Sequence, residues 1–266
     1  MQLLLRTNVF VAGGVTALGA WASGQLAIAP SAPLLLVLLS GTLLIYNLDH
    51  LRDDRRKEVL SPGARPRLDA RMRGWVLAGA GAGLAAGFAL GGSRLLLASL
   101  PAGLVGLLYG ASVFGGRLKD LPGAKSWLVA TAVAHAVALM PPLATGAPLG
   151  RATLVVAAFA VTLCALNAHC FDLRDVDVDA AGGSTTWAVH LGAPAAHRRL
   201  VALAALAAVA FAGLTIVERA PVEAPATLAL AAVSLLLVRP GAPRERYGLV
   251  VDGWLYAPLL LGALAG

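Results

Sequence analysis

Charged residues are scarce in this 266-residue chain, where they make up 13% of the positions against 58% for hydrophobic residues. The mean hydropathy of +0.77 lies far outside the range of a soluble domain, which argues against a water-soluble enzyme. Acidic residues are fewer than basic ones, 14 against 21, which gives a formal charge of +7. This charge does not indicate nucleic-acid binding, because the basic residues lie between apolar segments and form no patch on a soluble module.

Cysteine is also rare, with only Cys164 and Cys170 in the whole chain. Their spacing matches no metal-ligand pattern, and a single pair implies no disulfide framework. Both fall in or beside one apolar segment, so we expect buried, inert thiols.

Long apolar segments recur from one end of the chain to the other. A membrane-spanning helix needs about 20 mostly apolar residues. Windows of this kind lie near 8–27, 31–48, 74–91, 94–114, 126–147, 151–170, 199–217, 222–238 and 249–265. The sequence therefore predicts one all-α integral membrane domain over residues 1–266, with nine transmembrane helices and two halves of roughly 1–125 and 126–266.

The basic residues are distributed unevenly about these segments. If the N-terminus lies inside, 18 of the 21 lysines and arginines fall in inner segments, and only Arg94, Arg151 and Arg219 fall in outer loops. Inner loops of membrane proteins carry such an excess of positive charge. We therefore expect the N-terminus and the loops after the second and sixth helices to be cytoplasmic, in a bacterial inner membrane.

Half of the acidic residues gather in two short stretches, each following a long apolar segment. Residues 47–54 contain three aspartates and residues 172–179 contain four. Asp49 and Asp53 are four residues apart, as are Asp175 and Asp179, and this spacing places both carboxylates of a pair on one helix face. Such clusters repel themselves at a membrane boundary, so we expect a cation to compensate them.

Magnesium is the cation that suits this arrangement. It takes oxygen ligands and usually binds through one or two carboxylates together with substrate phosphates. A carboxylate–metal–diphosphate bridge removes the repulsion between protein acids and a diphosphate and stabilises diphosphate as a leaving group. Arg52 and Arg174, next to the acids, fit as further diphosphate contacts. The simpler interpretation is a solvated helix end where Asp and Arg pair locally, but two patches at equivalent positions favour a site.

The second stretch resembles the second aspartate motif of the UbiA superfamily of intramembrane prenyltransferases. Asp175 and Asp179 match its D-x-x-x-D pair, Asp172 lies just before them, and Thr186-Trp-Ala-Val-His-Leu-Gly192 is similar to the T-x-A-V-x-L-G segment that follows. Residues 109–125 resemble the family segment that supplies a diphosphate-binding lysine, and Arg6-Thr-Asn8 resembles its entry to the first helix. The first stretch departs from the family pattern, because Ile45 stands where asparagine is expected and Asn47 lies two residues later.

The resemblance implies a helical bundle around a central cavity, capped on the cytoplasmic side by the two aspartate-bearing loops. It implies a catalytic set that binds Mg²⁺ and a wider set that holds the substrate. The catalytic residues would be Asp49, Asp53, Asp175 and Asp179, with Asp54 and Asp172 as supporting metal ligands. The substrate-binding residues would be Asn8, Asn47, Arg52, Tyr109, Lys119, Lys125, Asn167 and Arg174.

The leading hypothesis is a Mg²⁺-dependent prenyltransferase that ionises an isoprenyl diphosphate and transfers the prenyl group to an aromatic or lipid-like acceptor. A UbiA-type terpene cyclase, in which a double bond of the substrate captures the cation, stays open. A transporter that couples to ions through intramembrane acids is a further alternative, although it predicts acids near the bilayer midplane. A structural membrane protein without catalysis is the last. We expect membrane lipid but no nucleic acid as a partner.

Overall fold

The protein is described from a computed structural model that covers residues 2–60, 69–113, 116–117, 119, 121, 123–181 and 183–265. Within these ranges, side chains are described at all positions except 2, 53–60, 112–113 and 116–117. Nearly all of it is helical. The first half contains α1 (Gln2–Arg6), α2 (Val9–Gln25), α3 (Ala32–Leu60), α4 (Ala70–Tyr109), β1 (Ser112–Val113), β2 (Gly116–Arg117) and α5 (Ala124–Ala134). The second contains a π-helical turn η2 (His135–Leu139), α6 (Met140–Thr145), α7 (Arg151–Arg174), α8 (Val176–Ala181), α9 (Trp187–Leu191), α10 (Ala193–Glu218), α11 (Glu223–Ser234), α12 (Arg244–Gly253) and α13 (Ala257–Ala265).

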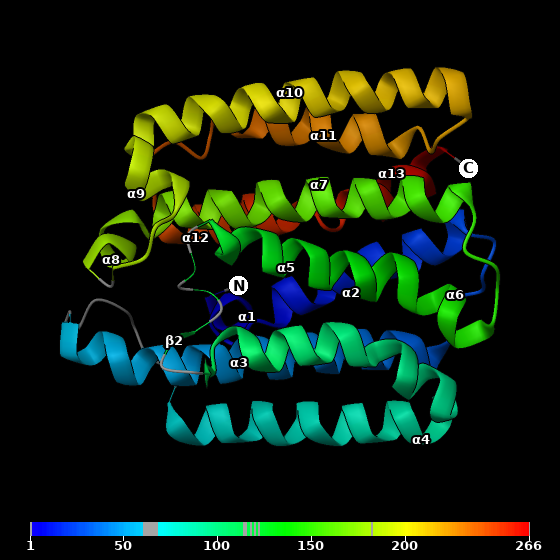
Figure 1. The fold of residues 1–266 in the computed structure, drawn as a ribbon, viewed down its shortest axis with the longest axis horizontal. Coiled ribbons are helices and arrows are strands. Elements are labelled where there is room, and N and C mark those ends of the chain that lie inside the picture. Colours follow the sequence, from blue (N-terminus) through cyan, green and yellow to red (C-terminus); the bar gives the residue numbers. More distant parts are fainter. Residues whose placement is uncertain are drawn as a thin grey trace.

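The long helices lie side by side as one bundle (Figure 1). In the described residues five helical segments are long and apolar enough to cross a membrane, or six if the bent pair α12 and α13 is one span. All nine apolar windows overlap helices, but α2 has only 17 residues and α11 only 12. The all-helical membrane fold is confirmed, whereas the number of nine crossings stays a prediction.

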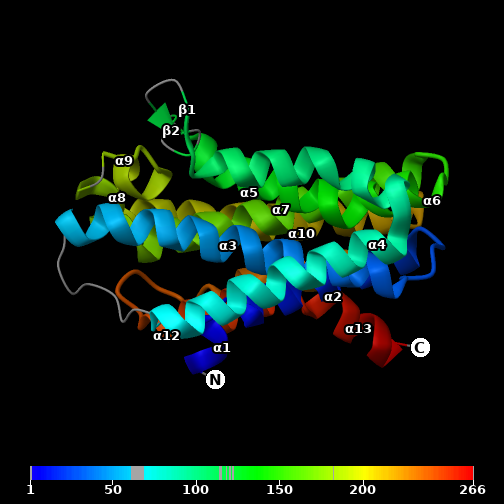
Figure 2. The same cartoon turned by 90° about the horizontal axis from the view of Figure 1, so that it is seen from below.

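Helix α4 accounts for two of the expected windows. Its backbone is broken at Gly92, which has φ 74° and ψ −175°, a conformation that glycine adopts without the penalty a side chain would bring. The break falls between the windows 74–91 and 94–114, and the two arms run back along each other (Figures 1 and 2). The second arm ends at Tyr109, five residues earlier than expected, and β1 and β2 form a small hairpin after it.

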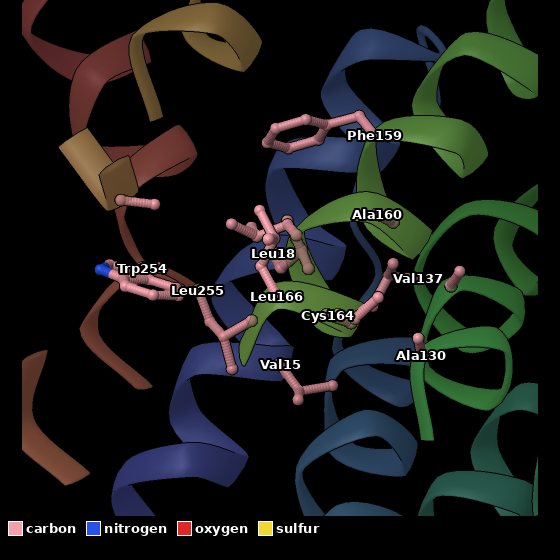
Figure 3. Packing of buried hydrophobic residues seen from close by; sticks show 14 of the residues in the cluster. Val15, Leu18, Ala130, Val137, Phe159, Ala160, Cys164, Leu166, Trp254 and Leu255 are labelled. Carbon is pink, nitrogen blue, oxygen red and sulfur yellow. The ribbon is translucent and has the colours of Figure 1, made fainter. Parts of the chain in front are cut away.

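Figure 3 shows part of the buried hydrophobic cluster, to which α2, α7 and the turn after α12 contribute large side chains. Leu18, Phe159 and Trp254 are among the largest fully buried side chains there. Small residues allow this approach: a side chain at Gly14 would collide with Leu255 and Tyr256. Close contact through small residues is how helices associate in lipid, where apolar burial alone provides little drive. The helices that pack in this cluster also carry residues of the candidate site at one end of the bundle.

Candidate functional site

The two aspartate stretches lie at the same end of the bundle. The C-terminal part of α3 carries the first, and the end of α7 with α8 carries the second (Figure 1). The first turns of α5 and α12 reach the same end and bring basic side chains with them. Segments far apart in the sequence thus meet in one charged cluster.

Lys125, in the first turn of α5, joins two of the acids. Its Nζ lies 2.9 Å from Oδ1 of Asp172 and 2.6 Å from Oδ2 of Asp179. Both carboxylates are buried, with 2% and 5% of their surface exposed, and Ser126 donates a further hydrogen bond of 2.6 Å to Asp172. Burial raises the pKa of Asp179, and the Lys125 ammonium opposes that shift only in part. Two carboxylates therefore converge on a single positive charge.

Asp175 faces different cations. It ends α7, and Arg174 holds it through Nε–Oδ1 and Nη2–Oδ2 contacts of 3.1 and 2.7 Å. Arg244, in the first turn of α12, reaches it from the other side at 3.1 Å. Asp175 and Asp179 lie one helical turn apart, because α7 ends at Arg174 and the Asp179 amide donates to the Asp175 carbonyl at 2.8 Å, but their carboxylates contact different cations. The pair that faces one cation is Asp172 and Asp179.

Asp49 connects the charged cluster to the interior of the bundle. Its Oδ1 accepts a 2.6 Å hydrogen bond from Lys119, whose ammonium lies 5.2 Å from the centre of the Tyr109 ring. Gly110 lies directly against this carboxylate, and a Cβ at that position would overlap it. Lys119 is buried, with 6% exposed, so its pairing with Asp49 replaces the water it lacks.

A cavity of about 290 Å³ begins at Asp49 and extends between α2, α3, α4 and α5. Asp49, His50 and Tyr109 line its charged end. Farther along, the walls are almost entirely apolar and include Phe88 and Met140. Among the described residues that line it, the ionisable groups thus gather at the end near Asp49 and the other walls are mainly apolar, a composition that suits a ligand with a long apolar body and one anionic head.

A second, much smaller pocket lies on the other side of Lys119. Lys125, His169 and Asp172 also line it, beneath the loop that leads into α9. The His169 ring stacks on Trp187, with centroids 4.3 Å apart, and its Nδ1 lies 3.5 Å from Oδ2 of Asp172. At about 10 Å³ the pocket holds roughly one water-sized group.

The two asparagines expected to bind substrate both donate hydrogen bonds to backbone carbonyls of other helices. The Asn47 amide donates to the carbonyl of Thr7 at 3.1 Å, at the break between α1 and α2. The Asn167 amide donates to the carbonyl of Val251 at 3.0 Å, in the last turn of α12, and to Asp252 at 3.3 Å. In this structure the two side chains link the acid-bearing helices α3 and α7 to neighbouring helices.

The remaining residues of the expected substrate set also have protein partners. Asn8 has a left-handed backbone between α1 and α2, and its amide lies 3.4 Å from Nδ1 of His50. Arg52 donates to the carbonyl of Leu107 on α4 at 3.0 Å. The expected ligands Asp53 and Asp54 have side chains outside the described part of the structure.

Magnesium fits the donor chemistry of this cluster. Among the described side chains no three His, Cys, Asp or Glu residues stand close enough together to hold a metal ion. Asp172 and Asp179 nevertheless point their oxygens at one cationic nitrogen. Two carboxylates are the usual protein share of a Mg²⁺ site that substrate phosphates and water complete.

Two contributors were not expected from the sequence, Arg244 and Ser126. Arg244 lies in the basic segment before the last helix, where the charge count assigned it only a role in topology. Ser126 follows a lysine that the family resemblance singled out, but a serine at a helix start carries no specific signal. Only the tertiary structure brings either one to an aspartate.

Comparison with known proteins identified similar folds but no similar sequences. No family model matches the chain, and no curated protein is similar to it in sequence. An apo UbiA homologue from Aeropyrum pernix K1 superposes with a TM-score of 0.66 at 17% identity, over 95% of this chain and 98% of that one. A UbiA homologue from Archaeoglobus fulgidus, solved with GPP and Mg²⁺, gives a TM-score of 0.62 at 17% identity, over 99% and 100%.

A third structure, described as a digeranylgeranylglyceryl phosphate synthase, gives a TM-score of 0.54 at 12% identity, over 99% of this chain and 97% of that one. These likenesses span essentially the whole chain. They confirm the expected resemblance to the UbiA superfamily at the level of the fold.

Proposed function

We propose that this protein is a Mg²⁺-dependent intramembrane prenyltransferase. The observation that carries the proposal is the largely apolar cavity with the carboxylate of Asp49, paired with Lys119, at one end. Beside it lie three further buried aspartates and three more cations. An isoprenyl diphosphate has the matching chemistry, since it is one apolar chain with one strongly anionic head.

The acids and bases of the cluster have complementary tasks in this proposal. Asp49, Asp172, Asp175 and Asp179, with Asp53 and Asp54, would hold Mg²⁺, which would neutralise the diphosphate and make it a better leaving group. Lys119, Lys125, Arg174 and Arg244 would contact the diphosphate oxygens through charge-assisted hydrogen bonds. Most of these cations now neutralise the acids, so substrate binding exchanges one set of opposite charges for another.

The reaction divides between the two parts of the site. The bond between C1 of the prenyl chain and the diphosphate oxygen breaks, and its electron pair leaves with the diphosphate. The allylic cation remains in the apolar cavity, which excludes water and so prevents hydrolysis. Tyr109 and Phe88 are among the residues that line that cavity, and an aromatic ring can stabilise a nearby cation. A nucleophilic atom of an aromatic or lipid-like acceptor then bonds to C1, and the proton that it loses passes to the released diphosphate.

Support for this reading comes from structures of the same fold. The Archaeoglobus fulgidus homologue was solved bound to GPP and Mg²⁺, and again bound to DMAPP and Mg²⁺. The digeranylgeranylglyceryl phosphate synthase points to a lipid-like acceptor for one protein of this fold. We carry the substrate class and the metal over to this chain because its cavity and charged cluster have the chemistry that they require.

The test is diphosphate release from C5, C10, C15 and C20 prenyl diphosphates by the purified protein in detergent with Mg²⁺, with and without aromatic and lipid acceptors. We expect release, and we expect Asp172→Asn to reduce it at least about a hundredfold, the scale on which a lost metal or electrostatic contact acts. Asp177→Asn is the matched control, because Asp177 lies in the same stretch but is exposed. No release with any chain length would reject the proposal, and a cyclic product without acceptor would identify a cyclase instead.

A further inference from the structure

Two hydroxyl groups interrupt the mainly apolar wall of the large cavity. Thr42 and Tyr46 both line it, on the same helix α3 that carries Asp49. They lie four residues apart, so their side chains stand on one face of the helix, and a long helical side chain points back toward the N-terminus. The Tyr46 ring therefore extends away from the charged end in the direction of Thr42. The two hydroxyls belong to one stretch of the wall.

Neither hydroxyl is used by the protein itself. Threonines elsewhere in the helices, such as Thr16, Thr162 and Thr215, donate to the carbonyl four residues earlier at 2.8–2.9 Å. In the described part of the structure, Thr42 makes no such bond and the Tyr46 hydroxyl has no hydrogen-bond partner. Neither oxygen is among the fully enclosed polar atoms that lack a partner, so both reach open space. Polar groups in this situation are available to a ligand.

The space beside these hydroxyls is not filled by protein. Gly41 adjoins Thr42 and lines the same cavity, and a Cβ added there would meet only Leu84, at 3.9 Å. Gly103, on the second arm of α4, also lines the cavity, and a Cβ added there would meet no described atom within 4 Å. The Tyr46 ring packs against the buried hydrophobic cluster, which limits its movement. The cavity thus presents ordered hydroxyl groups to a space that a ligand can enter.

Both hydroxyls lie near the place where a prenyl chain would react. At 1.5 Å per residue, Tyr46 lies about 5 Å and Thr42 about 10 Å along α3 from Asp49, where the diphosphate and C1 of the chain would be held. Among the described residues that line the cavity there is no lysine or arginine. A second anionic group beside C1 would therefore be desolvated without a counter-charge, whereas a neutral polar group would not carry that cost.

We infer that Thr42 and Tyr46 form a binding site for a neutral hydroxyl group of the acceptor. This inference rests on the proposed function and adds the chemical class of the acceptor to it. Each of the two side-chain hydroxyls can donate and accept a hydrogen bond, so the acceptor hydroxyl accepts from one and donates to the other. The rest of the acceptor contacts the apolar wall. A phenol with an alkyl chain and a lipid alcohol share this chemistry.

The experiment measures binding of two neutral alcohols, 4-nonylphenol and 1-O-hexadecylglycerol, to the purified protein by calorimetry in detergent. Mg²⁺ is present, together with whichever unreactive prenyl thiolodiphosphate of C5, C10, C15 or C20 binds most tightly. Nonylbenzene, which lacks the hydroxyl, is the comparison compound. We expect wild type to bind at least one of the alcohols, and the tighter of the two identifies the acceptor as aromatic or lipid-like.

Two variants each remove one hydroxyl with little change in side-chain shape. Tyr46→Phe and Thr42→Val should each weaken the preferred alcohol about three- to tenfold, which is the worth of one neutral hydrogen bond. Both should leave nonylbenzene and the thiolodiphosphate within about twofold of their wild-type affinities. Thr131→Val is the matched control, because Thr131 is exposed on α5 and donates to its own backbone. Partition of a probe into detergent cancels when the variants are compared with wild type.

Failure of the inference can be told from failure of the proposed function. If wild type binds none of the four thiolodiphosphates, the proposed function itself is rejected. If it binds one of them but binds neither alcohol, or binds the preferred alcohol equally in wild type, Tyr46→Phe and Thr42→Val, the function stands and the inference is overturned. Equal weakening of nonylbenzene and the alcohol also overturns it, because the loss then comes from the shape of the cavity. Each variant tests the site by itself, so the result does not depend on both of them folding.

Discussion

Replacing Lys125 with alanine removes the one cation that holds two buried carboxylates together. Asp172 and Asp179 lie 2.9 and 2.6 Å from its ammonium and are almost fully buried. Without that cation, both lose their shared ion pair, and the hydrogen bond from Ser126 and the 3.5 Å contact with His169 are left to Asp172. Removing one partner of a buried ion pair costs about 3–5 kcal/mol, and for a chain of this size each kcal/mol lowers the melting temperature by about 2–4 °C.

We therefore expect Lys125→Ala to melt roughly 6–20 °C below wild type in detergent without divalent metal. Magnesium should then stabilise the variant more than the wild type, because the vacated position between the two carboxylates suits a divalent cation. A ligand present at about a hundred times its dissociation constant adds about 2.7 kcal/mol. Thermal unfolding followed by tryptophan fluorescence, with increasing Mg²⁺, measures both effects.

Two controls separate this explanation from a general loss of packing. Lys125→Arg keeps the charge and should recover most of the stability. Arg151→Ala breaks an ion pair with Glu218 at an exposed position, where such pairs are worth at most about 1 kcal/mol. If Lys125→Ala melts within about 2 °C of wild type, or if Mg²⁺ shifts both proteins equally, the two carboxylates do not form a shared cation site.

Three further predictions follow from the same cluster. Arg244→Ala removes one of the two arginines on Asp175 and should raise the KM for the prenyl diphosphate about tenfold with little change in kcat, whereas Arg246→Ala, two residues on, should not. Gly110→Ala places a methyl group against the Asp49 carboxylate and should lower diphosphate release at least about tenfold, while Gly24→Ala, whose added Cβ meets nothing within 4 Å, should leave it unchanged. Because the pKa of Asp179 is raised in the folded state, protonation of this group stabilises the fold as the pH falls, but it weakens Mg²⁺ binding over the same range. Loss of the Mg²⁺-dependent thermal shift should therefore begin above the ordinary aspartate pKa of about 3.9, and Asp179→Asn should remove that step.

Much of this site could be predicted because its residue types are out of place in lipid. An aspartate at the end of a membrane helix is costly, so its presence indicates a functional role. Asp49, Asp172 and Asp179 were identified as site residues on that basis. Lys119 and Lys125 came from the resemblance of their segment to a family motif, and the structure places both against aspartates. The apolar windows located the helices for a similar reason, since lipid allows few alternatives to helical backbone.

The partners of these residues could not be predicted in the same way. Arg244 is about 70 residues from Asp175 in the sequence, and nothing in its own segment distinguishes it from Arg239 or Arg246. The link between Asp172 and Asp179 through Lys125 was also not predicted, because the D-x-x-x-D spacing relates Asp175 to Asp179 and does not show which cation each carboxylate contacts. In each case the packing of α12 and α8 determines which residues come into contact, and that packing depends on the whole bundle.

The asparagine contacts have a mechanical consequence for the site. Asn47 lies two residues before Asp49 on α3, and it is bonded to the break between α1 and α2. Asn167 lies five residues before Asp172 on α7, and it is bonded to the end of α12, whose first turn carries Arg244. A shift of either acid-bearing helix toward a bound ligand must stretch one of these bonds or carry the broken helix with it. Any such shift would therefore also move the N-terminal and C-terminal helices, and these are the parts of the chain where a probe of that motion should be attached.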